Sequence, residues 1–143
     1  MNVQINTAKV ALSSFLILYS NTKIGITDCS FINVKGIGSG AVFKSENDYS
    51  EIKFLNATFK NNSAHQGGLF KIAKGNLFCI ECKMVNNFGV EGGILHLSSD
   101  GKIHFDNSVF EQNSAVAYSF SIQESIWDSL VSNSNFSSNK VLT

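Results

Sequence analysis

A motif that recurs about every 26 residues constrains this chain more than any other feature of its sequence. Each copy has an apolar anchor, four copies carry Asn three residues after the anchor, and two of these copies then carry a pair of glycines. A fixed period of this length indicates a solenoid, in which every repeat forms one coil that stacks on the next. The anchors are Ile5, Phe31, Phe59, Met84, Phe110 and Phe136, and the Asn residues are Asn62, Asn87, Asn113 and Asn139.

The apolar residues within a repeat alternate with polar ones, which favours strands over helices. Ile52 and Phe54 flank Lys53, and such a period of two is the pattern of a half-buried strand. A second apolar run follows each glycine pair, at 69–72 and 94–97. We interpret the segments 74–76 and 98–101, which are rich in Gly, Ser, Asn and Asp, as connections between strands.

Stacked coils place equivalent residues above one another at the strand spacing of about 4.8 Å. The anchors are therefore expected to form an inward apolar stack. The Asn column is expected to form a hydrogen-bonded ladder, because buried polar groups need partners. Gly68 and Gly93, with Gly40 at the same distance from its anchor, mark a corner where neighbouring coils approach closely. Upstream, residues 13–17 are predicted to lie in register with residues 39–43.

The pattern resembles the polymorphic outer-membrane-protein repeat, whose signature is Phe-x-x-Asn together with Gly-Gly-Ala and an aliphatic residue. The matching stretches are 59–62 with Gly67-Gly68-Leu69, 84–87 with Gly92-Gly93-Ile94, and 110–113. The resemblance covers most of residues 24–139, although Leu69 and Ile94 replace the Ala and the last copies lack the glycines. It implies a right-handed parallel β-helix of the pectin-lyase-like type and a surface-exposed, adhesin-like parent protein.

We therefore expect an all-β chain, a right-handed single-stranded parallel β-helix of about five and a half coils. Residues 1–143 would form one domain, as the length indicates, and we expect it to be a fragment of a longer solenoid. The competing fold is a leucine-rich-repeat-type binding module, because Phe54, Ala57, Phe59 and Asn62 also fit the spacing L-x-x-L-x-L-x-x-N.

Composition excludes some classes of function. The chain has eleven basic and eleven acidic residues and no basic patch, so nucleic-acid binding is disfavoured. The three histidines, His65, His96 and His104, occupy different columns, and we interpret them as surface residues. We expect no metal site and no cofactor. The three cysteines, Cys29, Cys79 and Cys82, fall in apolar or small-residue columns and are expected to be buried free thiols.

Few residues suggest chemistry. The column three residues before the anchor contains Asp28 and Glu81, which would lie two rungs apart, near the upper limit of the carboxylate separation in inverting glycosidases. Asp48 and Glu51 lie in the longest connection between strands, and Trp127 lies where the repeat breaks. We treat these five residues as weak binding candidates and assign no catalytic residue.

These observations favour a non-catalytic structural or interaction solenoid of a secreted or cell-surface adhesin-like protein, anchored in the membrane through regions outside this chain. The alternative is a polysaccharide-active β-helix enzyme of the pectate-lyase or polygalacturonase type. Expected partners are a protein or glycan on a surface, and flanking repeats or another chain at the open coil ends. The sequons at Asn56, Asn61 and Asn135 would be used only in the secretory pathway.

Overall fold

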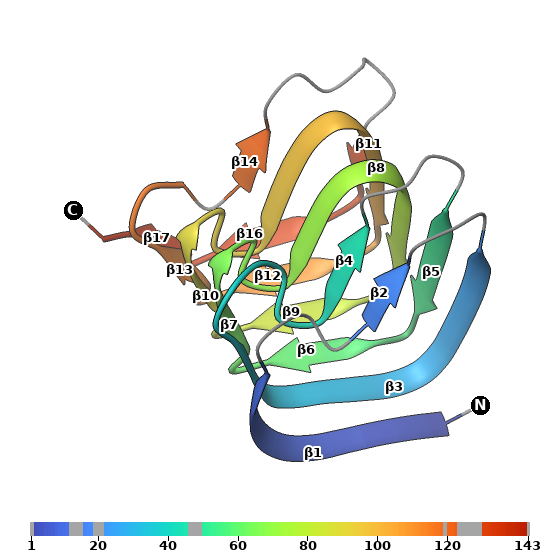
Figure 1. Cartoon of the computed structure of the whole chain (residues 1–143), viewed down its shortest axis with the longest axis horizontal. Helices are drawn as coiled ribbons and strands as arrows, with labels where there is room; N and C mark the ends of the chain where they lie inside the picture. The colour runs from blue at the N-terminus through green and yellow to red at the C-terminus, as the bar shows by residue number, and fades with distance from the viewer. Residues whose placement is uncertain are drawn as a thin grey trace.

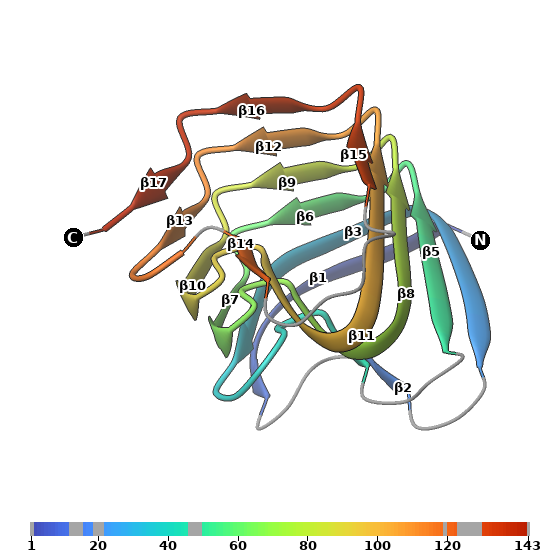
Figure 2. The same ribbon diagram turned by 90° about the horizontal axis from the view of Figure 1, so that it is seen from above.

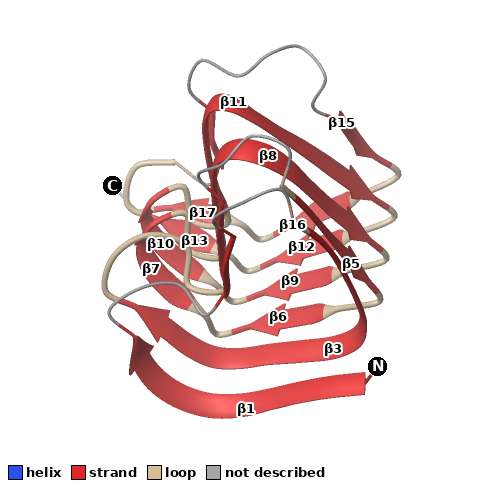
Figure 3. Ribbon diagram, turned by 45° about the vertical axis from the view of Figure 1, so that its right-hand side comes forward, coloured by secondary structure: helices blue, strands red, loops and turns tan. Residues whose placement is uncertain are grey.

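The chain folds into a parallel β-solenoid. The computed structural model describes residues 2–11, 16–18, 22–45, 50–118, 120–122 and 130–142. All the helical or strand structure in these ranges is β-strand, with no helix among them (Figure 1, Figure 3). The chain turns clockwise as it moves away from its N-terminal coils, so the solenoid is right-handed (Figure 1, Figure 2). The all-β prediction and the β-helix prediction are confirmed.

Four long strands run around a bend of the coil, and the remaining strands are short. The long strands are β1 (Asn2–Ala11), β3 (Lys23–Gly36), β8 (Phe70–Ile80) and β11 (Leu95–Asp106). The short strands are β2 (Leu16–Leu18), β4 (Phe43–Ser45), β5 (Glu51–Leu55), β6 (Thr58–Lys60), β7 (Ser63–Gln66), β9 (Lys83–Val85), β10 (Phe88–Glu91), β12 (Val109–Glu111), β13 (Ser114–Ala115), β14 (Phe120–Ile122), β15 (Leu130–Ser132), β16 (Asn135–Ser137) and β17 (Lys140–Val141).

Strands from successive coils pair in parallel on each side of the solenoid. The anchor side consists of the central part of β3 with β6, β9, β12 and β16, and these strands lie in one flat stack (Figure 2). The side that we call the flank consists of the first part of β3 with β5, the last part of β8, the last part of β11, and β15. A leucine-rich coil has one strand per repeat, so strands on successive sides identify a β-helix instead.

The anchors stand in register through the stack. Ile5 pairs with Phe31, and the column continues through Phe59, Met84, Phe110 and Phe136. The described residues complete about four turns with a spacing of about 26 residues. The sequence-based count of five and a half coils included early residues that lie outside the described ranges, among them 12–15 and 19–21.

From β3 onward, two corners of each coil are made by residues with positive φ. At the first corner φ lies between 46° and 55°, and at the second corner between 53° and 59°. Asn and Asp adopt this left-handed conformation more readily than most residues, which accounts for much of the Asn content of the chain. The first-corner residues are Asp28, Asn56, Glu81, Asn107 and Asn133, and the second-corner residues are Asn33, Asn61, Asn86, Gln112 and Ser138.

The two glycines of each pair are required for different reasons at the third corner of the coil. Gly67 and Gly92 have φ of 57° and 65°. Gly68 and Gly93 have no positive φ, but a Cβ on either would collide with backbone of the next coil. Gly40, with φ of 56°, corresponds to Gly67, because the amides of both donate to equivalent carbonyls, Gln66 and Glu91. The sequence spacing, which placed Gly40 with Gly68, was therefore wrong by one residue.

The slip arises from one extra residue in the earlier coil. Lys35 pairs with Ser63, whereas Ser39 pairs with Gln66, so residues 36–38 contain the insertion. The upstream register was also wrong by one residue, since Leu16 rather than Ile17 pairs with Phe43. Corners absorb such insertions because their backbone is not held in a continuous ladder.

Segments 74–76 and 98–101 are strand, not the connections that the sequence suggested. Asp100 pairs with Lys74 and Gly101 with Gly75, so hydrogen bonding continues through the bends of β8 and β11. Gly75 has φ of 88°, and a Cβ on Gly101 would press against Leu97 and Ile72 of the core. The polar, glycine-rich composition therefore belongs to a tight bend within each strand. The two strands bend at the same place and stay paired.

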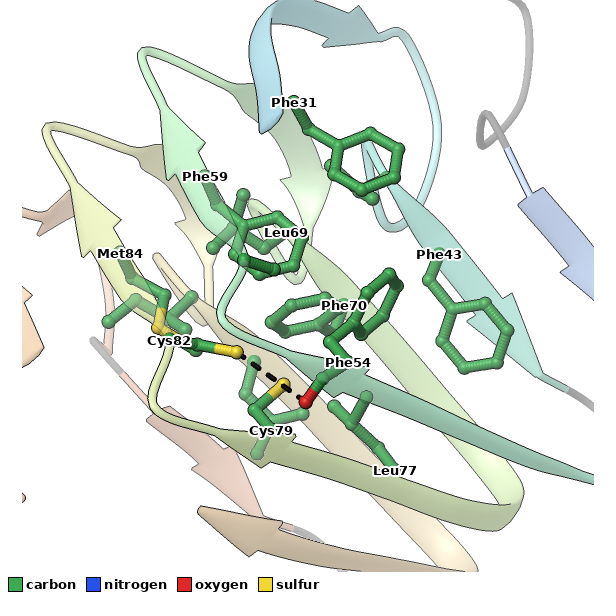
Figure 4. Close-up of a cluster of buried hydrophobic side chains, with 14 of the residues drawn as sticks. Phe31, Phe43, Phe54, Phe59, Leu69, Phe70, Leu77, Cys79, Cys82 and Met84 are labelled. Atoms are coloured by element: carbon green, nitrogen blue, oxygen red, sulfur yellow. Dashed lines mark hydrogen bonds between the residues drawn. The ribbon is translucent and has the colours of Figure 1, made fainter. Parts of the chain in front are cut away.

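The core is a column of rings surrounded by rings at right angles (Figure 4). The rings of Phe31 and Phe59 are stacked with centroids 5.3 Å apart, and those of Phe110 and Phe136 with centroids 4.4 Å apart. Met84 lies fully buried in the same column. Phe54 packs edge-on against Phe59 at 5.1 Å, a geometry that the ring quadrupole favours.

Each interior Asn of the ladder makes its full set of side-chain hydrogen bonds along the solenoid axis. The Nδ2 group of Asn87 donates to the carbonyl of Phe59 at 3.0 Å and to Oδ1 of Asn113 at 2.8 Å. Its Oδ1 accepts from the amide and from Nδ2 of Asn62 at 3.0 and 3.1 Å. Asn113 repeats this pattern with Met84, Asn87 and Asn139. Buried amides without these bonds would be costly.

A second ladder of small side chains runs parallel to the first. The amide of Cys82 donates to Oγ of Ser108, and the amide of Ser108 donates to Oγ of Ser134, both at 3.2 Å. The thiol of Cys82 contacts the carbonyls of Phe54 and Ile80 at 3.7 and 3.4 Å. Cys82 thus occupies the position of a serine hydroxyl in this column.

Replacing Asn87 with Ala should lower the free energy of unfolding by about 3 kcal/mol or more, because buried donors of Asn62 are left without acceptors. Urea titration followed by circular dichroism measures the loss. Asn86→Gly is the matched control: this neighbouring residue is exposed with φ of 59°, where Gly is unstrained. Equal losses in the two variants would contradict the ladder's role.

The anchor column offers a second comparison. Phe110→Ala should cost about 3–5 kcal/mol of unfolding free energy by leaving a cavity. Phe136, in the same column, is 47% exposed, so Phe136→Ala should cost only about 1–2 kcal/mol from partial burial. The same titration measures both variants, and a larger loss at Phe136 would contradict the described packing.

Candidate functional site

The acidic candidates Asp28 and Glu81 lie at a corner whose geometry explains the residue types found there. Both are exposed and have positive φ, as does Asn56 on the rung between them. The side-chain Nδ2 group of Asn56 donates to Oδ1 of Asp28 at 2.7 Å. The side-chain amide of Asn56 therefore lies between the two carboxylates. The residues of this column are explained by the positive φ that the corner of the backbone requires.

The other sequence candidates are not brought together by the structure. Glu51 lies in β5 and forms an ion pair with Lys23 at 3.9 Å. Exposed pairs of this kind contribute little to stability. Asp48 and Trp127 lie outside the described residues.

The flank carries a recess that the sequence analysis missed. The rings of Phe78 and His104, on neighbouring coils, lie 5.7 Å apart at an angle of 37°. They border a shallow recess of about 240 Å³, which Asn76, Lys102 and the backbone-flanking residues Leu77 and Ile103 complete. Both side chains are half-buried, so each is partly accessible to solvent. The alternation of apolar and polar residues along β8 and β11 places these residues on the outer surface, and this alternation could have identified them from the sequence.

A polar cluster surrounds the glycine corner on the outer surface. The Nζ group of Lys71 donates to Oε1 of Gln66 at 2.8 Å, and Nε2 of Gln66 donates to Oε2 of Glu91 at 3.0 Å. His96 lies above Lys71 in the pairing register and is only 5% exposed. The prediction that all three histidines are surface residues is therefore wrong for His96, whose Nδ1 has no hydrogen-bond partner in the part of the chain that the structure describes.

The environment of His96 disfavours its charged form. Burial lowers its pKa below the ordinary value of 6.5, the positive charge of Lys71 lowers it further, and Glu91 opposes both effects. Protonation of His96 is therefore expected to destabilise the folded coil.

A larger, polar recess of about 480 Å³ lies at the second corner of the last coils. Its lining is amide, hydroxyl and ammonium groups with a single apolar side chain. The residues are Asn86, Gln112, Asn113, Ser114, Ser138, Lys140 and Leu142.

The cysteines serve packing. All three are buried and free of disulfides, and Cys79 and Cys82 lie side by side in the core with the Phe54 carbonyl (Figure 4). Burial raises the pKa of Cys29 to about 11 and raises that of Cys79 well above its ordinary value. Protonated buried thiols are poor nucleophiles, so Cys29 and Cys79 act as small core side chains. The side-chain hydrogen bond with Cys79 lowers the pKa of Cys82, whose thiol is buried against the carbonyls of Phe54 and Ile80.

The structure adds three findings, on a carboxylate, on metal sites and on membrane-spanning helices. Asp106, on the flank, accepts from Oγ of Ser132 at 2.8 Å and from Nδ2 of Asn133 at 3.0 Å, and these bonds lower the pKa of its carboxyl group. Within the described ranges no three His, Cys, Asp or Glu side chains are grouped as a metal site. The described part also holds no helix with the length and apolarity to span a membrane.

Comparisons with known proteins were made at three levels. No profile of a known protein family, no curated protein sequence and no solved structure matched the chain.

Acidification should destabilise the protein through His96. The unfolded chain takes up this proton near pH 6.5 and the folded chain only at lower pH, so the free energy of unfolding falls as pH drops from about 6.5 through the folded pKa. His96→Gln should remove this part of the pH dependence, measured by urea titrations between pH 7.5 and about 4.5. His65→Gln, at an exposed position, is the control, and an unchanged slope in His96→Gln would refute the assignment.

Proposed function

We propose that the chain is a non-catalytic structural and interaction solenoid of a secreted or cell-surface, adhesin-like protein. We further propose that it belongs to the pectin-lyase-like class of β-helices with polymorphic outer-membrane-protein-like repeats, anchored in the membrane through regions outside this chain. The observation that carries the proposal is that the polar residues of the repeat are used in stacking. The Asn column bonds along the axis, and the column of Asp28 and Glu81 forms a corner of the backbone.

The flank is the side on which binding is proposed. Residues in its outward columns differ from coil to coil, as Lys53, Phe78 and His104 do at one register position. The partly exposed rings of Phe78 and His104 suit the apolar face of a sugar ring. Asn76 and Lys102 beside them supply donors for hydroxyl or carboxylate groups. We therefore propose a surface glycan as the ligand of this recess.

Binding of the purified chain to immobilised polygalacturonate and to neutral galactan tests the proposal by biolayer interferometry. Phe78→Ser should weaken binding about tenfold or more, since a ring-stacking contact and its buried area are lost. Val109→Ser makes the same kind of change at an outward, half-buried position on the anchor side and should leave binding unchanged. Circular dichroism verifies that both variants fold.

Two results would overturn the proposal. One is the absence of binding to either polymer, or equal binding by the chain and by Phe78→Ser. The other is cleavage of polygalacturonate, followed as new reducing ends or unsaturated products with and without calcium, that Asp28→Asn or Glu81→Gln abolishes. That second result would establish the polysaccharide-active alternative.

A further inference from the structure

The glycine corner of the middle coils holds a lysine, an amide, a carboxyl group and a hydroxyl in mutual contact, and we call these four residues the corner cluster. The Nζ group of Lys71 donates to Oε1 of Gln66 at 2.8 Å. From the next coil, Oε2 of Glu91 accepts from Nε2 of Gln66 at 3.0 Å. From the preceding coil, Oγ of Ser39 donates to Oε1 of Gln66 at 3.4 Å. The side-chain amide of Gln66 therefore has an amine and a hydroxyl at its oxygen and a carboxyl group at its nitrogen.

Among these three coils, an amide side chain and a lysine occur together only on the middle one. The preceding coil has a serine and a lysine at the two equivalent positions, and the next coil has a glutamate and a histidine. These residues are Ser39 and Lys44, and Glu91 and His96. The middle coil thus carries a nucleophile beside a carboxamide, and its two neighbours add a hydrogen-bond donor and a carboxyl group.

The backbone around the corner cluster is held on both sides. The carbonyl of Gln66 accepts from the amide of Gly40 at 2.7 Å. The amides of Gly67 and Gly68 donate to carbonyls of the next coil at 2.7 and 2.8 Å. Lys71 lies in β8, which pairs with β4 on one side and with β11 on the other. Reacting groups that a fold keeps in contact react far faster than the same groups free in solution.

We propose that the corner cluster forms an amide cross-link between Lys71 and Gln66 within the folded chain. The neutral amine of Lys71 attacks Cδ of Gln66, so that the Nζ–Cδ bond forms, the Cδ–Nε2 bond breaks and Nε2 leaves as ammonia. The ammonia takes up the proton that the lysine ammonium group gives up, and it is released as an ammonium ion. Atoms and charge therefore balance without an oxidant or a second reactant.

The two neighbours of the Gln66 amide have different roles in this step. Negative charge develops on Oε1 as the amine attacks, and the hydroxyl of Ser39 stabilises it there by a hydrogen bond. Glu91 lies at the leaving nitrogen, where its carboxyl group relays a proton to Nε2 as the Cδ–Nε2 bond breaks. The attacking nitrogen releases its own proton to solvent, since Lys71 is only half-buried.

The cross-link would close a ring of residues 66–71 over the corner that Gly67 and Gly68 form. All three cysteines of the chain are free thiols, so this ring would be a covalent brace of a different chemistry. It lies at the glycine corner, whereas the glycan recess lies on the flank, and neither depends on the other.

Mass spectrometry of the purified chain, fresh and after several days in neutral buffer, tests the proposal. The cross-linked chain should be lighter by one ammonia and should carry one positive charge fewer in ion-exchange chromatography. Trypsin should no longer cleave after Lys71, so residues 61–74 should appear as a single peptide that lacks one ammonia. Guanidinium chloride should prevent the reaction, because the unfolded chain does not hold the four side chains together.

Substitutions separate the roles of the side chains. Lys71→Arg keeps the positive charge but has no amine nucleophile, so it should lose no ammonia. Glu91→Gln keeps an acceptor for Nε2 of Gln66 and should slow cross-linking about a hundredfold or more, because proton transfer is lost. Ser39→Ala should slow it about tenfold or more. Glu111→Gln, at a half-buried position of the anchor side, is the matched control and should react like the original chain. Circular dichroism verifies that every variant folds.

Four results would overturn the proposal. The first is an unchanged mass with complete cleavage after Lys71. The second is a loss of ammonia that persists in Lys71→Arg, which would place the reaction at another side chain. The third is conversion of Gln66 to glutamate by water without a cross-link. The fourth is an equal rate in the original chain and in Glu91→Gln, which would refute the part assigned to the carboxyl group.

Discussion

The side-chain amide of the ladder Asn is the interaction on which the solenoid depends. One Asn87 side chain joins three coils, since it bonds Asn62 and Phe59 on one side and Asn113 on the other. The hydrogen bonds of this amide are directional, whereas the apolar packing of the anchor column is not directional. Met84 can therefore stand among phenylalanines, whereas the bonds at Asn87 need a side-chain carboxamide, which only Asn and the longer Gln possess. The anchors contribute one apolar column to the core, and the directional bonds of the ladder favour the register in which that column is aligned.

The repeat period was sufficient to predict the class of fold and which residues share a column, because in-register stacking makes every coil experience the same environment. It was insufficient wherever one coil differs from its neighbours. The inserted residue in 36–38 shifted the apparent partner of Gly40. Segment 74–76 looks like a loop in composition, yet it pairs with 100–102 because both coils bend together. His96 is polar and pairs with Lys71 of the preceding coil, yet it is only 5% exposed.

The candidate site was less predictable than the fold for a related reason. Sequence analysis concentrated on the carboxylates Asp28 and Glu81, because their residue type suggests chemistry. The structure shows that a left-handed backbone explains this column. Phe78 and His104 belong to an outward column with no consistent residue type, so no repeat signal marks them. In a solenoid, columns with one residue type stabilise the stacking of the coils. Columns whose residue type varies give each solenoid its own surface.

Every strand pairing joins neighbouring coils, which are separated by about 26 residues in sequence. The chain has no single central nucleus, since each added coil brings the same set of contacts. Folding can begin at any adjacent pair of coils and spread in both directions, as in other nearest-neighbour arrays. The ladder makes the coils around Asn87 the most cooperative part of the molecule, because their bonds are made on both faces. Mechanical tension applied along the axis would therefore detach coils one at a time from an end, and the molecule would lengthen in discrete steps as it yields.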